Sequence, residues 1–165
     1  MDQELIKRWN SVVGSCDLVY HLGDYAFSHN KEYLHTLRAR LNGKIILIAG
    51  NHDRDKALKE SRIDTIYGHT KSAGIKTYPM VRIDLAGQQI ILCHYAMRVW
   101  DKSHWGIWHL YGHSHGSLPD DPRSLSYDVG VDKNNFTPLL FEEVKEIMSK
   151  KTFKPVDHHG EKRGE

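Results

Sequence analysis

Residues 44–54 read Lys-Ile-Ile-Leu-Ile-Ala-Gly-Asn-His-Asp-Arg, and this stretch decides how the rest of the chain is interpreted. Its apolar residues, 45–49, lie between Gly43 and Gly50, which is typical of a strand buried on both faces of a sheet. The strand is followed by Gly-Asn-His-Asp, which has no reason to be apolar or extended. Ligands of open α/β sheets bind just beyond the carboxyl ends of the strands. We therefore expect the chemistry of this protein at residues 50–54.

Three other apolar segments end in polar residues of a similar kind. Residues 18–24 end in Leu-Gly-Asp, residues 90–94 in Cys-His, and residues 108–115 in Gly-His-Ser-His. If four strands deliver these groups to one edge, a carboxylate, an amide oxygen and several imidazoles meet there. That mixture of ligands suits Mn, Fe or Zn. The sequence therefore predicts a metal site with these ligands: Asp24, Asn51, His94, His113 and His115.

Length and composition indicate one globular domain. The chain has 165 residues, of which 27% are charged and 39% hydrophobic, with a net charge of +2. We assign residues 1–150 to the domain and residues 151–165 to a flexible C-terminal tail. No apolar run is long enough to span a membrane, and two cysteines imply no disulfide framework. We expect a cytoplasmic protein without a membrane partner, and the small charge does not indicate nucleic acid.

Hydrophobic periodicity places helices and strands in alternation through the first half of the chain. An amphipathic helix ends at Gly14, and further helices are predicted over residues 31–41, 55–61 and 139–150. The order strand, helix, strand over residues 17–49 predicts a parallel pair with a right-handed crossover. Residues 80–85 and 89–93 flank Ala86-Gly87 and predict a hairpin. With further strands at 108–113 and 126–131, the fold class is α/β, a sandwich covered by helices.

The predicted ligands suit hydrolysis of a phosphoester. Two ions held about 3.5–4 Å apart activate a hydroxide and clamp a phosphoryl group for in-line displacement. Asp24 can bridge two ions because its carboxylate has two oxygens. In Gly-His-Ser-His, the alternation of a strand or of a tight turn would put His113 and His115 on one side. His52 is adjacent to the ligand Asn51 and is free to act on the leaving group or on a phosphate oxygen.

At this point the motifs resemble those of a known family, the calcineurin-like metallophosphoesterases. The matching residues are Gly23-Asp24, Gly50-Asn51-His52-Asp53, His94 and Gly112-His113-Ser114-His115, in the same order and at fitting separations. Residues 128–132, Asp-Val-Gly-Val-Asp, are also similar to the small bacterial and phage members. The resemblance covers the chain to about residue 150. It implies a sandwich of two mixed β-sheets flanked by helices, and hydrolysis of a phosphomonoester or phosphodiester by a metal-bridging hydroxide.

The resemblance also implies a role for each matched residue. Asp24 would be the bridging ligand, and the second metal site would be completed by Asn51, His94 and His113. His115 would belong to the first metal site. His52 would be the catalytic histidine, and Asp53, from the same motif, is counted with it as a catalytic candidate.

One family motif has no counterpart in this chain. The family opens with a strand that ends in Asp-x-His and supplies two ligands of the first site, whereas no Asp-x-His precedes Asp24 here. We expect an N-terminally truncated reading frame that lacks this first strand. The alternative is a remnant with one metal or none, which binds phosphate or a partner without catalysis. Two ions are thus expected in the complete family site, and one in this chain.

The substrate is expected to be a small phosphoester or a nucleotide-like ester. An aromatic cluster lies between His94 and the last motif, and its members with Arg98 are Tyr95, Trp100, Trp105 and Trp108. In one interpretation the aromatic rings stack on a base, and Arg54 or Arg98 binds phosphate. In the other interpretation, which we favour, the rings pack the loop against the sheet.

Three further histidines lie close to the predicted motifs. A single histidine at a strand end is more often a hydrogen-bonded structural residue than a ligand. We interpret His21 and His109 in this way, while His29 follows Asp24 closely enough to lie near the site.

Overall fold

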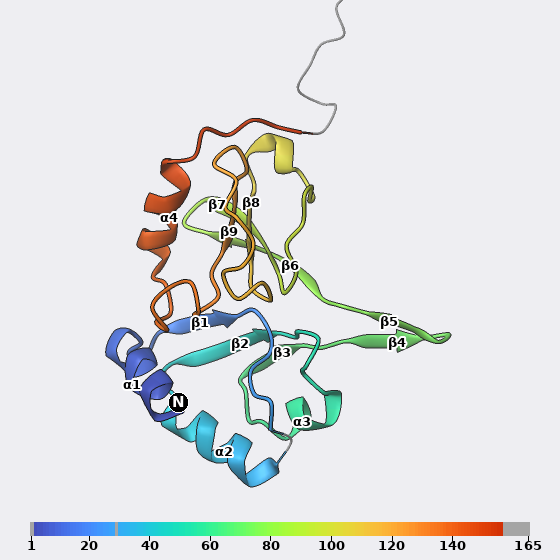
Figure 1. Cartoon of the computed structure of the whole chain (residues 1–165). Coiled ribbons are helices and arrows are strands. Elements are labelled where there is room, and N and C mark those ends of the chain that lie inside the picture. Colours follow the sequence, from blue (N-terminus) through green and yellow to red (C-terminus); the bar gives the residue numbers. More distant parts are fainter. Residues whose placement is uncertain (1, 29, 157–165) are drawn as a thin grey trace, which may run out of the picture.

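The computed structural model describes residues 2–28 and 30–156 (Figure 1). In chain order its elements are α1 (Asp2–Val12), β1 (Leu18–His21), α2 (Lys31–Arg40), β2 (Lys44–Ile48), α3 (Asp55–Lys59), β3 (Thr65–Tyr67), β4 (Thr70–Ser72), β5 (Ile75–Thr77), β6 (Met80–Leu85), β7 (Gln88–Cys93), a 3-10 helix (Ser103–Trp105), β8 (Trp108–Tyr111), β9 (Ser126–Asp128) and α4 (Phe141–Ser149). Each predicted helix and strand is present, with ends that differ by a few residues. The sequence did not predict β3, β4 and β5. Each of these strands has only three residues, and because these are exposed or half-exposed, they show no alternation of apolar and polar side chains.

The first sheet consists of β1, β2 and β3, and its strands are all parallel. Helix α2 connects β1 to β2, which confirms the predicted β-α-β unit. The Asn30 side chain caps this helix by accepting a hydrogen bond from the backbone N–H of Tyr33. From β2, Ile45 and Leu47 point toward helices α2 and α3, where they join the buried cluster that contains Leu34 and Leu58.

The second sheet has the strand order β6-β7-β8-β9. Strands β6 and β7 form the predicted hairpin, while β8 and β9 run parallel to β7. The α/β class with sheets flanked by helices is confirmed. Both sheets were expected to be mixed. This prediction is confirmed for the second sheet, whereas it is wrong for the first, whose strands are all parallel among the described residues.

Strand β7 is buried on both of its faces and ties the layers together. Ile90 and Leu92 belong to a core shared with Val144 of α4 and with Ile48 of the first sheet. On the opposite face, Ile91 packs with two residues of the 95–107 loop, Trp100 and Ile107. Full burial of such a side chain contributes about 1.5–3 kcal/mol. The shared core therefore fixes the carboxyl ends of β1, β2, β7 and β8 relative to one another.

A two-stranded ribbon, which we call the arm, consists of β4 and β5 and the turn between them (Thr70–Thr77). It extends away from both sheets in Figure 1, and the side chains of both strands are exposed. An isolated pair of strands is marginally stable in water. The position of the arm therefore depends on residues at its base.

Residues 151–156 follow α4 and lie against the loop before β9. The backbone N–H groups of Thr152 and Lys154 donate to the carbonyls of Pro122 and Arg123 at 2.8 and 2.9 Å. The Lys151 ammonium lies 2.7 Å from the Asp120 carboxylate. The remainder of the predicted tail, residues 157–165, lies outside the described residues. Within the described part of the chain, each helix is too short or too polar to cross a membrane.

Candidate metal centre

The carboxyl ends of four strands supply the predicted ligands. Asp24 follows β1, Asn51 follows β2, His94 follows β7 and His113 follows β8. One ligand atom each from Asp24, His94 and His113 lie within 4.8 Å of one another. The Asn51 Oδ1 atom is 2.9 Å from the His94 Nε2 atom. The structure thus brings together four of the five side chains that the sequence predicts as ligands.

The orientation of His94 fits a metal ligand. Its Nδ1 atom lies 2.6 Å from the carbonyl oxygen of Leu22, which can only accept a hydrogen bond, so Nδ1 carries the proton. The lone pair of Nε2 then faces Asn51 Oδ1 and, at 3.4 Å, Asp24 Oδ2. A backbone carbonyl that holds the second ring nitrogen is the usual support of a metal-binding histidine. Three electron-rich atoms converge, and they need a shared cation or proton.

The pKa of Asp24 is lowered and that of His94 is raised, so both shifts favour a positive charge between these two side chains. Burial by itself would raise the pKa of Asp24, but hydrogen bonds from His94 and from the backbone N–H of His52 lower it. Burial would lower the pKa of His94, but its hydrogen bonds to Asp24 and to the Leu22 carbonyl raise it. In the absence of a metal, a proton on His94 therefore provides part of the charge that the oxygens require.

Two glycines allow the ligand loops to approach one another. A Cβ atom on Gly23 would lie 2.5 Å from both the Gly50 nitrogen and the His94 Nδ1 atom. A Cβ atom on Gly50 would collide with the Asp24 carboxylate and would lie 2.7 Å from His94 Cε1. Gly23 also has a φ of +94°, which favours glycine. The glycine that precedes each oxygen ligand is therefore required by the close crossing of the two loops.

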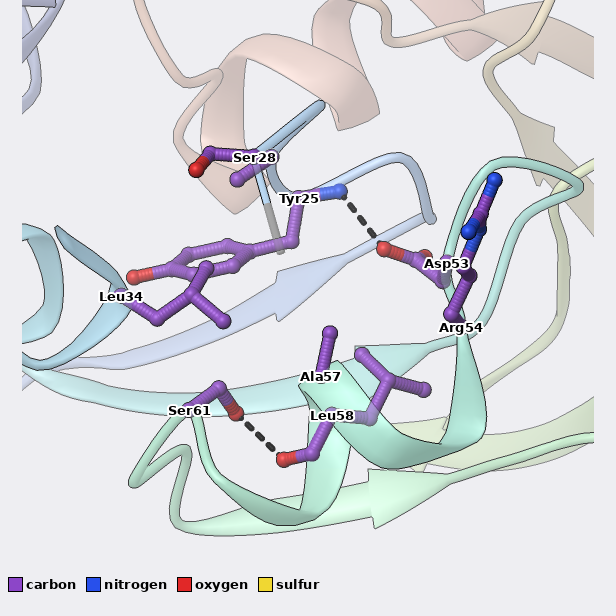
Figure 2. A pocket seen from close by; sticks show the side chains of 9 residues that line it. Tyr25, Ser28, Leu34, Asp53, Arg54, Ala57, Leu58 and Ser61 are labelled. Carbon is purple, nitrogen blue, oxygen red and sulfur yellow. Dashed lines mark hydrogen bonds between the residues drawn. The ribbon is translucent and has the colours of Figure 1, made fainter. Parts of the chain in front are cut away.

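Asp53 is buried beneath the centre, with 4% of its surface exposed. Its carboxylate accepts hydrogen bonds from the backbone N–H groups of Asp24 (2.8 Å), Tyr25 (3.0 Å) and Gly50 (2.9 Å). Figure 2 shows the contact with Tyr25 at the edge of a small cavity. The sequence suggested a catalytic role for Asp53, whereas its position makes it the residue that joins the Asp24 loop to the Gly50 loop.

Three predicted site residues adopt left-handed backbone conformations. Asp24, His113 and His115 have φ angles of 55°, 64° and 48°. Such conformations are uncommon for residues other than glycine, and they concentrate at functional sites. The backbone N–H of Ser114 also donates to the Gly112 carbonyl at 2.7 Å, so residues 112–115 form tight turns. Of the two conformations expected for this motif, a strand or a tight turn, the structure therefore has the tight turn.

His115 lies apart from the group formed by Asp24, His94 and His113. Its Nδ1 atom is 2.6 Å from the Asp132 carboxylate, and its side chain is 65% exposed. His52 is next to the centre. Its backbone N–H donates to Asp24 Oδ1 at 2.9 Å, and its exposed ring contacts Phe27 at 5.1 Å between centroids.

The predicted substrate residues divide into packed and exposed groups. Trp100 is buried and packs with Ile91 of β7, so the interpretation that the rings pack the loop against the sheet is confirmed for this residue. Trp108 instead belongs to β8 and packs on Phe141 of α4. Arg54 and Arg98 are exposed. Trp105 is 71% exposed in the 3-10 helix before β8, at the end of that strand opposite His113.

The other histidines have distinct surroundings. His109 is fully buried, with its ring nitrogens near the Ile91 and Tyr95 carbonyls at 3.1 and 3.2 Å, which confirms its structural interpretation. The His21 ring lies between the rings of Trp9 and Tyr25, and its buried Nδ1 atom has no hydrogen-bond partner among the described residues. His29 lies outside the described residues.

Sequence reasoning missed two residues beside the centre, His69 and Tyr78. Tyr78 contacts the Tyr95 ring at 5.4 Å, and Tyr95 in turn contacts the rings of His94 and His113 at 5.0 and 4.6 Å. His69 lies 2.9 Å from the Gly50 carbonyl oxygen. Both flank strands that are too short for a periodic signal, so no pattern in the sequence marked them.

Comparisons with known proteins agree with this geometry. Residues 2–126 match the family model for the calcineurin-like phosphoesterase superfamily domain. The chain is 30% identical over 156 residues to the uncharacterized protein MJ1445 of Methanocaldococcus jannaschii. The aligned region covers 91% of this chain and 76% of that protein. It is 27% identical over 170 residues to the gene 66 protein of Mycobacterium phage D29, covering 90% and 83%.

A solved structure has the same fold. The protein of unknown function AQ665 from Aquifex aeolicus superposes with a TM-score of 0.63 at 21% identity, covering 88% of this chain and 84% of that one. Four predicted ligands meet where the carboxyl ends of β1 and β2 from the first sheet face those of β7 and β8 from the second, and not at the edge of a single sheet as expected. The family model extends over most of the domain. The chain therefore belongs to the calcineurin-like phosphoesterase superfamily.

Proposed function

We propose that this protein is a metal-dependent phosphoesterase that hydrolyses a phosphomonoester or phosphodiester at the centre formed by Asp24, Asn51, His94 and His113. Membership of the superfamily supports the reaction class. The convergence of the Asp24, His94 and His113 ligand atoms is the observation that carries the proposal. The donor set of oxygen and imidazole nitrogen suits Mn, Fe or Zn. A divalent cation bound there would polarise a phosphoryl oxygen and make a water molecule nucleophilic at neutral pH.

Each residue of the centre has a task in this proposal. The backbone N–H of His52 holds Asp24 Oδ1, which leaves Oδ2 directed toward His94. The Leu22 carbonyl fixes the tautomer of His94 and so presents Nε2. The exposed imidazole of His52 is available to a phosphate oxygen or to the departing alcohol as a hydrogen-bond or proton donor.

A second candidate is a binding module with a single metal ion and no turnover. It is favoured by the position of His115, which pairs with Asp132 and is not among the three convergent residues. The number of ions bound per chain separates a two-ion centre from a one-ion centre.

Metal counting and turnover test the two candidates together. The purified protein is loaded with Mn²⁺, the bound metal is measured by elemental analysis, and hydrolysis of 4-nitrophenyl phosphate and bis(4-nitrophenyl) phosphate is followed. We expect metal-dependent turnover of at least one ester, abolished by chelation and by Asp24→Asn. Metal binding without turnover of either ester would favour the binding module.

A further inference from the structure

Two tyrosines form an aromatic surface directly beside the metal centre. Tyr95 follows the ligand His94 in the sequence, and its ring contacts His113 edge-on at 4.6 Å. Tyr78 contacts Tyr95 edge-on at 5.4 Å and is 39% exposed. The two rings therefore extend from the convergent histidines toward solvent, on the side where His113 is also exposed.

The base of the arm holds these rings in place. His69 directly precedes β4, and its Nε2 atom lies 2.9 Å from the Gly50 carbonyl oxygen, next to the ligand Asn51. The His69 ring also contacts the Tyr78 ring at 4.9 Å. Because Tyr78 directly follows β5, both ends of the arm are attached to the centre. The contacts that fix the position of the arm thus also hold Tyr78 beside the centre.

The polar atoms of this surface are suited to an anionic ligand. The Tyr95 and Tyr78 side chains are hydrogen-bonded to each other, and a phenolic hydroxyl can donate a hydrogen bond to an anion. The ammonium of Lys76 lies 4.8 Å from the centroid of the Tyr78 ring. Residues 69–79 contain two lysines and no acidic side chain.

From this arrangement we propose that Tyr78 and Tyr95 form an aromatic subsite, which binds a flat ring on the organic group of the phosphoester. The inference rests on the proposed function, because the phosphoryl group would occupy the metal centre. A flat ring would contact both tyrosines, because their own rings touch, with 5.4 Å between centroids. Stacking on aromatic side chains tolerates many flat rings, so the common feature is the ring. The lysine over Tyr78 adds attraction for the anion.

Ligand binding tests the subsite without relying on catalysis. The affinities of phenyl phosphate, adenosine 5′-monophosphate and methyl phosphate for the Mn²⁺-loaded protein are measured by calorimetry. All three carry a phosphate monoester, so the affinity ratio isolates the ring, and the first two separate aryl esters from nucleotides. We expect at least one ring-bearing ligand to bind roughly 10-fold more tightly than methyl phosphate. The preference should fall close to one in Tyr78→Ala.

Two further variants serve as controls for this test. Tyr78→Leu keeps an apolar side chain at this position, so it is the variant that should still fold if Tyr78→Ala does not, and it should also lose the preference. Trp105→Ala removes an exposed aromatic ring that likewise has a lysine over it, Lys102 at 5.3 Å, but lies at the opposite end of β8. This control should keep the preference. Equal preference in wild type and both Tyr78 variants, or no preference for a ring in wild type, overturns the subsite.

Turnover separates this inference from the proposed function. Phenyl phosphate and methyl phosphate both release inorganic phosphate, and only phenyl phosphate carries a ring, so the change in their kcat/KM ratio between wild type and Tyr78→Ala reports contact with the ring. If neither these monoesters nor bis(4-nitrophenyl) phosphate is hydrolysed but the binding preference depends on Tyr78, the enzyme proposal fails and the subsite stands. If both monoesters are hydrolysed with the same ratio in wild type and variant, the subsite fails and the enzyme stands.

Discussion

The imidazole of His94 donates to the carbonyl oxygen of Leu22 across 2.6 Å, and this bond joins the end of β7 to the loop after β1. The two strands belong to different sheets. The same bond selects the ring nitrogen that faces Asp24 and Asn51. One contact therefore connects the packing of the two sheets to the chemistry of the centre.

Substitution of His94 by alanine should remove metal binding. The variant loses a ligand, and the loss in Mn²⁺ affinity should exceed the roughly 10–100-fold that changes in outer-shell partners cost. His35→Ala on α2 is the control, since that residue is not part of the convergent group. Calorimetric titration with Mn²⁺ measures both. Retention of wild-type affinity in His94→Ala would exclude this nitrogen as a ligand.

Gly50→Ala should disrupt the centre, because the new methyl group would collide with the Asp24 carboxylate and with the His94 ring. Overpacking of this kind typically costs about 1–3 kcal/mol. The matched control is Gly68→Ala, where the nearest atom to the new methyl group is 4.0 Å away. Urea denaturation and Mn²⁺ titration of both variants measure the effect. Equal behaviour of the two variants would contradict the close crossing of the loops.

Asp53→Asn should lower stability as well as activity. The carboxylate accepts three backbone hydrogen bonds, and an asparagine turned toward them loses the charge and offers only one acceptor oxygen. We expect a loss in the free energy of unfolding of at least about 1.5–3 kcal/mol. Asp101→Asn breaks an exposed ion pair with Arg82 and should cost less than about 1 kcal/mol. Unchanged stability in Asp53→Asn, with turnover lost, would instead indicate a direct catalytic role.

The protein should lose stability as the pH falls below about 6.5. Burial lowers the pKa of His109 from its ordinary value of 6.5, so the unfolded chain binds more protons than the folded chain below that pH. Stability is then fully present above pH 6.5 and declines as the pH falls toward the lowered pKa. Burial also lowers the pKa of His21, with the same sign. Urea denaturation of wild type and His109→Gln from pH 8 to pH 5 measures the contribution of His109, and the variant should show the shallower dependence.

His115→Ala should leave one ion bound per chain. His115 pairs with Asp132 and is not among the convergent ligands, so the ion held by Asp24, His94 and His113 does not depend on it. Elemental analysis of the Mn²⁺-loaded variant counts the ions. A fall from two ions in wild type to one in the variant would assign His115 to the first metal site. Loss of all bound metal would show that His115 also supports the ion held by Asp24, His94 and His113.

The strands that carry the predicted ligands could be recognised in the sequence, because the buried part of each strand is apolar and the loop that follows it is polar. Residues 45–49 are apolar without a break, since both faces of β2 are buried, and the chain turns polar at Asn51, where the strand leaves the core. The glycines before Asp24 and Asn51 mark the place where two loops cross too closely for a Cβ atom. These signals are local, so a linear pattern is sufficient to detect them.

The contacts of Asp53, His115, Tyr78 and His69 became visible only in three dimensions. Whether a carboxylate meets a metal or three backbone N–H groups depends on which loops enclose it, and nothing in Gly-Asn-His-Asp distinguishes the two. Likewise, left-handed turns direct His115 to Asp132, and the short exposed arm brings Tyr78 to Tyr95. The sequence by itself determined which strand ends carry the predicted ligands, because burial imposes a local pattern. Tertiary structure decided which partners those ends meet, because contacts between distant loops leave no period in the chain.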